Sequence, residues 1–299
     1  MRMSDSNGVQ IGRRAFLQAG ALILAASTPR GQDLYADERS SVLRIGMVTD
    51  LHHADKPPHG TRHYRESIEK LAAAATQFAS DKIDFVVELG DLIDAADSVD
   101  VELEYLSAVN QKFSSIAADR HYVLGNHCVD TLTKDEFLQT IGREQSFYSF
   151  DRQGFHFIVL DACFRFDDMP YGRRNSKWTD TNLSAEELRW LRADLQATEH
   201  PVIVFVHQRL DVEGVHGIRN QAEVRAIMES SGKVLAVFQG HSHKNALTEI
   251  AGIHYCTMVA MVEGAGIESN GYSVIRVLQD STIQISGFRK QATYRWDTA

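Results

Sequence analysis

Cysteine, proline and basic charge are all scarce in this chain of 299 residues, which has 3 cysteines and 5 prolines. Three cysteines cannot supply the disulfide framework of a small secreted scaffold, so an apolar core must hold the fold. Only 31 Lys and Arg oppose 40 Asp and Glu. The resulting net charge of −9 argues against a nucleic-acid-binding protein, because phosphate backbones select basic surfaces.

Long apolar runs are missing too, since none reaches the roughly 20 residues that a membrane-spanning helix needs. The overall composition, 43% hydrophobic and 24% charged, is typical of globular proteins and excludes disorder, collagen-like repeats and coiled coil. What the chain does have is histidine, with 13 residues. Their distribution carries most of the functional information.

Residues 1–40 predict a targeting segment and linker. Arg13 and Arg14 precede an apolar stretch over residues 16–26, which has the length of a signal-peptide core. The order Arg-Arg-x-Phe-Leu resembles the twin-arginine export signal of bacteria. The alternative is a chance arginine pair on an amphipathic helix. We therefore expect export to the periplasm or the medium, no stable membrane association after signal removal, and a single domain over residues 41–299.

From residue 43 onward, short apolar runs alternate with amphipathic stretches, which is typical of βαβ units. A hairpin is expected over residues 147–160, a capping box of Ser184 and Glu187 before a helix that ends at residue 197, and further strands over 247–288. The spacing predicts strands over 43–49, 85–89, 121–124, 202–206 and 234–238, and helices over 64–80, 99–118 and 222–228.

Polar residues with metal-ligand chemistry follow each of the five predicted buried strands. A lone His is more often a core or surface residue and a lone Gly-Asp is usually a turn, but five such strand ends in order favour a shared site. Carboxylate, carboxamide and imidazole donors suit Mn, Fe or Zn. The residues are Asp50 and His52, Asp91, Asn126 and His127, His207, and His241 and His243.

Local geometry supports the same site. Asp50 and His52 are two residues apart, so an extended backbone would place both on one side, and His241 and His243 repeat this spacing. Glycines precede Asp91, Asn126 and His241, and we expect them to permit close approach of the backbone.

The ordered motifs Asp-x-His, Gly-Asp, Gly-Asn-His, His and Gly-His-x-His resemble those of the calcineurin-like metallophosphoesterases. The resemblance implies an α/β fold, a four-layer αββα sandwich of two mixed β-sheets flanked by helices. It also implies two divalent metal ions, with manganese expected ahead of iron or zinc, and His127 as a catalytic residue that stabilises the transferred phosphate or protonates the leaving group. The alternative for His127 is a purely orienting role. By the same resemblance, Asp50, His52, Asp91 and His243 would hold one ion, and Asp91, Asn126, His207 and His241 the other.

Three further stretches are similar to the manganese-dependent ADP-ribose/CDP-alcohol diphosphatases. They are residues 61–65 (Thr-Arg-His-Tyr-Arg), 90–94 (Gly-Asp-Leu-Ile-Asp) and the tail from 252–255 through Glu263 to 287–289. This resemblance implies a nucleoside-diphosphate-linked substrate. The chain departs from the group at His52, where glutamine is frequent, at Cys128 and at Arg209.

Several residues have less specific predicted roles. Arg62, Arg65 and His254 are expected to orient a substrate phosphate, and Asp94 to orient the loop of Asp91. Three side chains on the long loop 162–182, Arg173, Arg174 and Trp178, belong either to a substrate lid or to a solvated surface. Cys128 and Cys163 either pair or remain buried thiols.

Together these features predict a dinuclear metal-dependent hydrolase of phosphoric ester or phosphoanhydride bonds, acting by attack of a metal-bridging hydroxide on a small phosphorylated substrate such as ADP-ribose or a CDP-alcohol. Alternatives are an exported phosphomonoesterase, a cyclic-nucleotide phosphodiesterase, and a catalytically inactive metal-binding recognition module. An inactive module would be expected to have lost a ligand, whereas all seven candidate ligands are present.

Overall fold

The computed structural model describes residues 17–18, 21–22 and 41–296. Leu17–Gln18 (β1) pairs antiparallel with Ala21–Leu22 (β2), and the chain from Ser41 onward forms a separate compact unit. Apart from these two short strands, the predicted targeting segment lies outside the described residues. Among those that are described, helices long and apolar enough to cross a bilayer are not found.

The first sheet of the main unit has six strands in the order β14-β13-β12-β3-β4-β5. Strands β3, β4 and β5 are parallel, while β12, β13 and β14 add to the sheet in antiparallel fashion, so the sheet is mixed. The strands are Ser41–Val48 (β3), Phe85–Glu88 (β4), Arg120–Tyr122 (β5), Gly271–Leu278 (β12), Ile283–Arg289 (β13) and Tyr294–Trp296 (β14).

The second sheet is also mixed and has the order β10-β11-β9-β8-β7-β6. Its four central strands are parallel, and an antiparallel strand closes each edge. The strands are Tyr148–Arg152 (β6), Phe155–Val159 (β7), Val202–Phe205 (β8), Val234–Gln239 (β9), Ala246–Ile250 (β10) and Ile253–Thr257 (β11).

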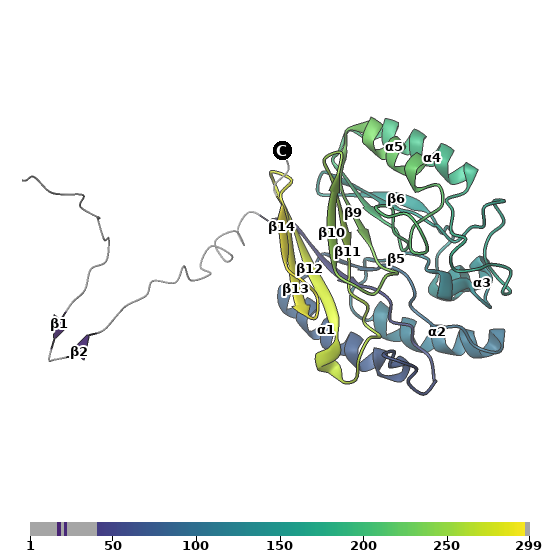
Figure 1. Cartoon of the computed structure of the whole chain (residues 1–299), viewed down its shortest axis with the longest axis horizontal. Helices are drawn as coiled ribbons and strands as arrows, with labels where there is room; N and C mark the ends of the chain where they lie inside the picture. The colour runs from purple at the N-terminus through teal and green to yellow at the C-terminus, as the bar shows by residue number, and fades with distance from the viewer. Residues whose placement is uncertain (1–16, 19–20, 23–40, 297–299) are drawn as a thin grey trace, which may run out of the picture. The chain divides into compact units, whose positions relative to one another are not determined.

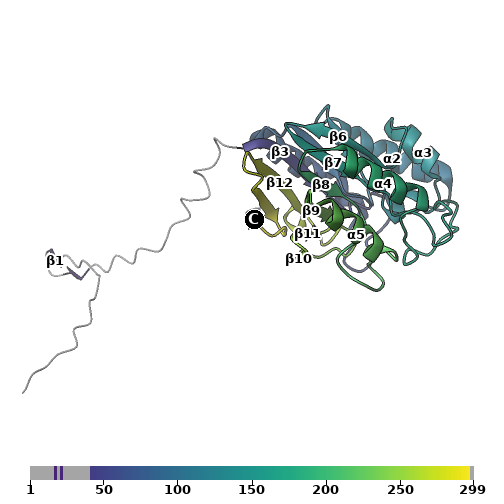
Figure 2. The same ribbon diagram turned by 90° about the horizontal axis from the view of Figure 1, so that it is seen from above.

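Helices cover the outer face of each sheet. Ala185–Ala197 (α4) and Gln221–Ser231 (α5) lie side by side over the second sheet, and Figures 1 and 2 show both on that side. The first sheet is covered by Ser67–Asp81 (α1), Val99–Ser114 (α2) and Lys134–Ile141 (α3). Short 3₁₀ turns are Tyr64–Glu66 (η1), Asn126–Val129 (η2) and Ile267–Ser269 (η3).

Three apolar clusters separate these layers. In β7, Phe157 and Val159 face the cluster between the two sheets, while Ile158 faces α4 and α5, as the period-two alternation of a strand requires. In β3, Ile45 and Val48 divide between two clusters in the same way. Strands buried on both faces explain the continuous apolar runs in the sequence. Each fully buried large side chain contributes about 1.5–3 kcal/mol of transfer free energy. The predicted αββα sandwich is confirmed.

Differences from the predicted elements are local. The helix expected over residues 99–118 ends at Ser114, and α3 was not predicted at all, although Thr133 and Glu136 form a full capping box at its start. At α4 the expected capping box is only half formed. Ser184 accepts the backbone N–H of Glu187, but the Glu187 carboxylate accepts the N–H of Asp161 instead. A tertiary contact has replaced the local one.

Candidate metal centre

The candidate ligands lie where strands of both sheets end. Asp50 and His52 follow β3 and Asp91 follows β4, while Asn126 lies after β5 at the start of η2. The second sheet contributes His207 after β8, and His241 and His243 after β9. Because these strands are parallel within each sheet, their carboxyl ends share one edge of the sandwich.

The backbone at these strand ends is left-handed rather than extended. Positive φ angles occur at Asp50 (51°), His52 (44°), Asp91 (59°), His241 (68°) and His243 (59°). The prediction of an extended backbone for the pairs Asp50/His52 and His241/His243 is therefore wrong. Non-glycine residues seldom adopt this conformation, and such strain is concentrated at functional sites, where the surrounding structure enforces it.

Glycines let the loops approach each other, as expected. A Cβ atom on Gly90 would overlap the ring of His207, and one on Gly125 would overlap the carboxylate and backbone of Asp91. A Cβ on Gly240 would overlap Thr49 and the Asp50 carboxylate. These three contacts each join segments far apart in the sequence, so glycine is required there for close approach.

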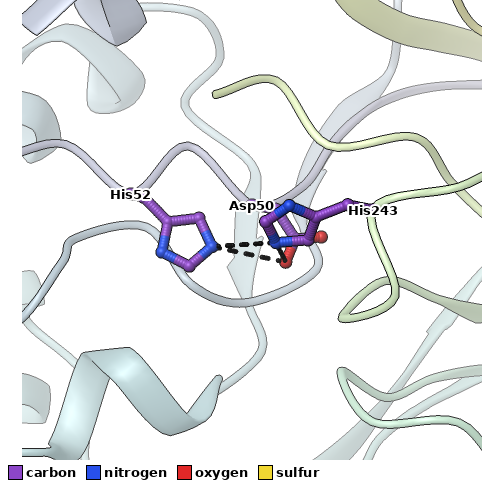
Figure 3. A group of neighbouring side chains, drawn as sticks. All are labelled: Asp50, His52 and His243. Carbon is purple, nitrogen blue, oxygen red and sulfur yellow. Dashed lines mark hydrogen bonds and ion pairs between the residues drawn. The ribbon is translucent and has the colours of Figure 1, made fainter. Parts of the chain in front are cut away.

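One group of donors consists of Asp50, His52 and His243, whose ligand atoms lie within 4.8 Å of one another. Figure 3 shows the two imidazoles and the carboxylate pointing toward a common point. The Nε2 atoms of His52 and His243 are 3.2 Å apart, and Asp50 Oδ1 is 3.3 Å from His243 Nε2 and 3.7 Å from His52 Nε2. Asp50 is held in place because its other oxygen accepts hydrogen bonds from Thr49 Oγ1 and the His241 backbone N–H.

A second group consists of Asp91, His207 and His241. Asp91 Oδ2 is 3.1 Å from His207 Nε2 and also 3.6 Å from His52 Nε2 in the first group. The opposite ring nitrogen of His207, Nδ1, donates to the Leu89 carbonyl at 2.8 Å, which leaves Nε2 as the nitrogen that faces Asp91. Asp91 is thus the residue that joins the two groups.

Buried polar atoms without hydrogen-bond partners provide the test of fit for metal ions. Native structures rarely leave such atoms unsatisfied, and each one calls for an explanation. Five of the seven candidate ligands have one. In His52 the atom is Nδ1, while its Nε2 faces Asp50 and His243, and in the other four the atoms are Asp50 Oδ1, Asn126 Oδ1, His207 Nε2 and His241 Nε2. All four are atoms that ligate metals, so this donor set fits divalent cations that accept imidazole and oxygen ligands.

The electrostatics of the groups favour added positive charge. Burial lowers the pKa of His52 to about 4 and that of His241 to about 3, so both imidazoles are neutral and able to ligate. Burial also opposes protonation of His243, but the carboxylates of Asp50 and Glu263 outweigh it and raise its pKa to about 9. The His207 imidazole, aided by His127, holds the pKa of Asp91 far below its usual range despite burial.

Two carboxylates outside the ligand set position histidines. Glu263 Oε1 is 2.7 Å from His243 Nδ1, and this contact lowers the pKa of Glu263 to about 2. The sequence prediction missed this role, although Glu263 lies in a stretch that matched the diphosphatase pattern. Asp94 Oδ1 is 2.6 Å from His127 Nδ1 and also accepts the backbone N–H of Ala95 at 2.9 Å, so Asp94 orients His127 as well as the loop that carries Asp91.

His127 lies beside both groups and is more exposed than the ligands, with 27% of its side chain accessible. Its backbone N–H donates to Asp91 Oδ1 at 2.8 Å, and its ring is 4.6 Å from that of His52. Burial lowers the pKa of His127, but the Asp91 and Asp94 carboxylates outweigh that effect and raise it. This places a chargeable ring at the open side of the site.

The three predicted phosphate contacts differ in their placement. Arg62 pairs with Glu263 through the backbone, and its positive charge acts on both His127 and His243, so it borders the site. Arg65 is exposed and pairs with Asp55 at 2.5 Å. His254 aligns with Ala236 near the beginning of β9, at the opposite end of the strand from His241, and stacks on Trp296. Contrary to expectation, the structure places His254 away from this site, and Arg65 pairs with Asp55 rather than with a member of the two groups.

Contacts in the structure decide between the alternative roles predicted for two arginines of the loop 162–182 and for two cysteines. The Arg173 guanidinium pairs with Glu136, and Arg174 donates to the Ala96 carbonyl, so both arginines anchor the loop 162–182. Cys128 and Cys163 are buried free thiols.

Residues 43–245 match the family described as calcineurin-like phosphoesterase, and the chain belongs to this family. It is therefore a metallophosphoesterase, a hydrolase of phosphoric ester or anhydride bonds. Relatives include the manganese-dependent ADP-ribose/CDP-alcohol diphosphatases of Oryza sativa subsp. japonica, 25% identical with 77% of this chain and 87% of the relative covered, and of Danio rerio, 24% identical with 74% and 88% covered.

Solved structures share the fold. A dimetal phosphatase from Danio rerio superposes with a TM-score of 0.75 at 20% identity, covering 87% of this chain and all of the other. A purple acid phosphatase from yellow lupin gives a TM-score of 0.55 at 16% identity, covering 86% of this chain and 53% of the other.

Proposed function

We propose that this protein hydrolyses the phosphoanhydride bond of a nucleoside-diphosphate-linked substrate, such as ADP-ribose or a CDP-alcohol, with two divalent metal ions. The observation that carries the proposal is the convergence of six donors from both sheets, Asp50, His52, Asp91, His207, His241 and His243. Three of them, and Asn126 at the start of η2, have buried oxygen or Nε2 atoms without a hydrogen-bond partner. The names of the relatives support the choice of substrate class and of manganese.

In the proposed assignment, Asp91 contributes to both metal sites. Two divalent cations at such a site supply Lewis acidity and lower the pKa of bound water. The chain's own residues then have separate tasks: His127, held by Asp94, faces the substrate as a catalytic residue, and Arg62 contributes positive charge for a phosphate. One ion would be held by Asp50, His52, Asp91 and His243, and the other by Asp91, Asn126, His207 and His241.

The test uses the full chain, stripped by a chelator and then reloaded with Mn²⁺, Fe²⁺ or Zn²⁺. We expect the Mn²⁺ form to convert ADP-ribose and water to AMP and ribose 5-phosphate, and to do so with a higher kcat/KM than for p-nitrophenyl phosphate, bis-p-nitrophenyl phosphate or cyclic AMP. The stripped chain should be inactive, and activity should return with the metal. Product formation is followed by chromatography.

Two outcomes would contradict this proposal in different ways. Faster turnover of the monoester or of cyclic AMP would replace the diphosphatase by a phosphomonoesterase or a phosphodiesterase. If no substrate turns over with any of the three metals, the chain is an inactive metal-binding module instead.

We further propose that residues 1–40 direct export through the twin-arginine route and that residues 41–299 form the mature domain. The Arg13-Arg14 pair before the apolar stretch supports this. A reporter fused to residues 1–40 should reach the bacterial periplasm, and the double variant Arg13→Lys/Arg14→Lys should block it. Equal export of both fusions would exclude the twin-arginine route.

A further inference from the structure

A cavity of about 330 Å³ opens directly beside the candidate metal centre. Asn126 and His127 form one wall, so a group bound in the cavity would lie next to the reacting bond. Most of the remaining lining belongs to the loop 162–182. Its members here are Tyr171, Ser176, Lys177, Trp178 and Thr179, and Ala95 and Asp130 complete the lining.

Trp178 is the largest side chain of this lining and is 46% exposed. Its ring lies 5.5 Å from that of His241 at 57° and 5.7 Å from that of His216 at 40°, so both contacts are tilted rather than stacked. Tryptophan side chains are highly buried on average in folded proteins, although rarely fully so. Here Trp178 is placed against a metal-ligand candidate, at the edge of the cavity.

The loop that carries Trp178 is firmly held. Arg173 and Arg174 both have positive φ, at 53° and 57°, and their side chains bond to Glu136 and the Ala96 carbonyl. Tyr171 is buried, and its hydroxyl donates to the Lys177 carbonyl at 3.1 Å. A strained turn fixed by these contacts keeps the indole in place before any ligand binds, which lowers the entropy cost of binding.

The cavity's chemistry matches a nucleobase and its sugar. A base has apolar faces that stack on aromatic rings and a polar edge that hydrogen-bonds. The lining offers the exposed indole of Trp178 as an aromatic platform beside Ser176, Thr179 and Asp130. Lys177 adds a positive charge suited to a phosphate. The volume lies at the small end of the range for ligand pockets, about 300–1,000 Å³, which suits one nucleoside.

We propose that Trp178 is a specificity-determining residue whose indole stacks on the nucleobase of the substrate, with the nucleoside in the cavity bounded by Asn126, His127 and loop 162–182. The inference rests on the proposed hydrolysis of nucleoside-diphosphate-linked compounds. Base stacking would explain why the enzyme prefers a diphosphate that carries a nucleoside over one that has no base.

The first test compares kcat/KM for ADP-ribose with kcat/KM for P1,P2-dimethyl diphosphate, which has the same anhydride but no base. One base stacked on one aromatic ring corresponds to about 5-fold to about 150-fold in binding. Trp178→Ala should lower the ratio of the two constants by a factor in this range, mainly through a higher KM for ADP-ribose, and Trp178→Phe should retain most of the ratio. The matched control is Phe166→Ala. Phe166 is an aromatic residue of the same loop that is 63% exposed and lies outside the lining, so its replacement should not change the ratio of the two kcat/KM values.

The second test does not need turnover. The chain has three tryptophans, so AMP titrated into the Mn²⁺-loaded protein should quench part of the indole fluorescence, and Trp178→Phe should remove that part while Trp190 and Trp296 still emit. Ribose 5-phosphate, which lacks a base, should not quench.

The outcomes separate the two proposals. An unchanged ratio in Trp178→Ala, with ADP-ribose hydrolysed normally, overturns the stacking role and leaves the proposed function intact. If Trp178→Ala lowers kcat/KM for ADP-ribose and for P1,P2-dimethyl diphosphate by the same factor, Trp178 only supports His241, and the stacking role is overturned as well. If none of the diphosphates is hydrolysed, the proposed function fails, and the AMP titration alone then supports or overturns base stacking.

Discussion

Replacing Asp91 with Ala is expected to lower kcat/KM by about 10³-fold or more. Loss of one group that stabilises charge at the reacting centre costs about 10²–10³-fold, and Asp91 is expected to serve both metal ions. The expectation comes from its position: one carboxylate oxygen is 3.1 Å from His207 Nε2 and 3.6 Å from His52 Nε2, so it faces donors of both groups. The other oxygen accepts the backbone N–H of His127. We therefore expect the variant to lose both metal ions together with activity.

The comparison variant is His52→Ala, which in the proposed assignment removes one donor from one ion only. Metal content per chain, measured on both variants after dialysis against equal Mn²⁺, should fall further for Asp91→Ala. Circular dichroism checks that each variant is folded. Equal metal loss in the two variants would contradict a bridging role for Asp91.

Much of this site could be predicted because parallel strands impose their own geometry. Asp50, Asp91 and His207 follow buried strands, and the rule that carboxyl ends of parallel strands share an edge brings them together without knowledge of any side-chain contact. The need for glycine at Gly90 and Gly240 follows from the same crowding of loops. Residue type and position relative to a strand were sufficient evidence for these features.

Contacts formed only by tertiary packing could not be read in this way. The pairing of His243 with Glu263 depends on where the loop after β11 folds back against β3, with Val262 N–H donating to the Asp50 carbonyl. His254 matched a family pattern, yet its register opposite Ala236 places it at the far end of the strand. The left-handed backbone at Asp50 and His52 could not be predicted from the sequence either. The local preference of these residues disfavours this conformation, and only the assembled site enforces it.

Replacing His127 with Ala is expected to lower kcat for ADP-ribose by about 10²–10⁴-fold, the usual contribution of a general acid or base, with metal content unchanged. Asp94, 2.6 Å away, orients the His127 ring. This ring is also more accessible to solvent than the histidines of the two donor groups. If it protonates the leaving group, the loss should be larger for diphenyl phosphate than for bis-p-nitrophenyl phosphate, because phenolate is the more basic leaving group and gains more from a proton. Loss of metal in this variant would make His127 a ligand instead.

Asp94→Asn provides the matched test of orientation, since it keeps the shape of the side chain but removes the charge that holds the His127 ring. Loss of such a supporting contact costs about 10–100-fold, so this variant should be less impaired than His127→Ala. Because Asp94 acts through His127, the double variant should be no slower than His127→Ala alone, as expected for residues that act as one unit. Independent, multiplicative losses in kcat would instead show that Asp94 has a separate task, such as holding Lys56, which lies 3.5 Å from its other oxygen.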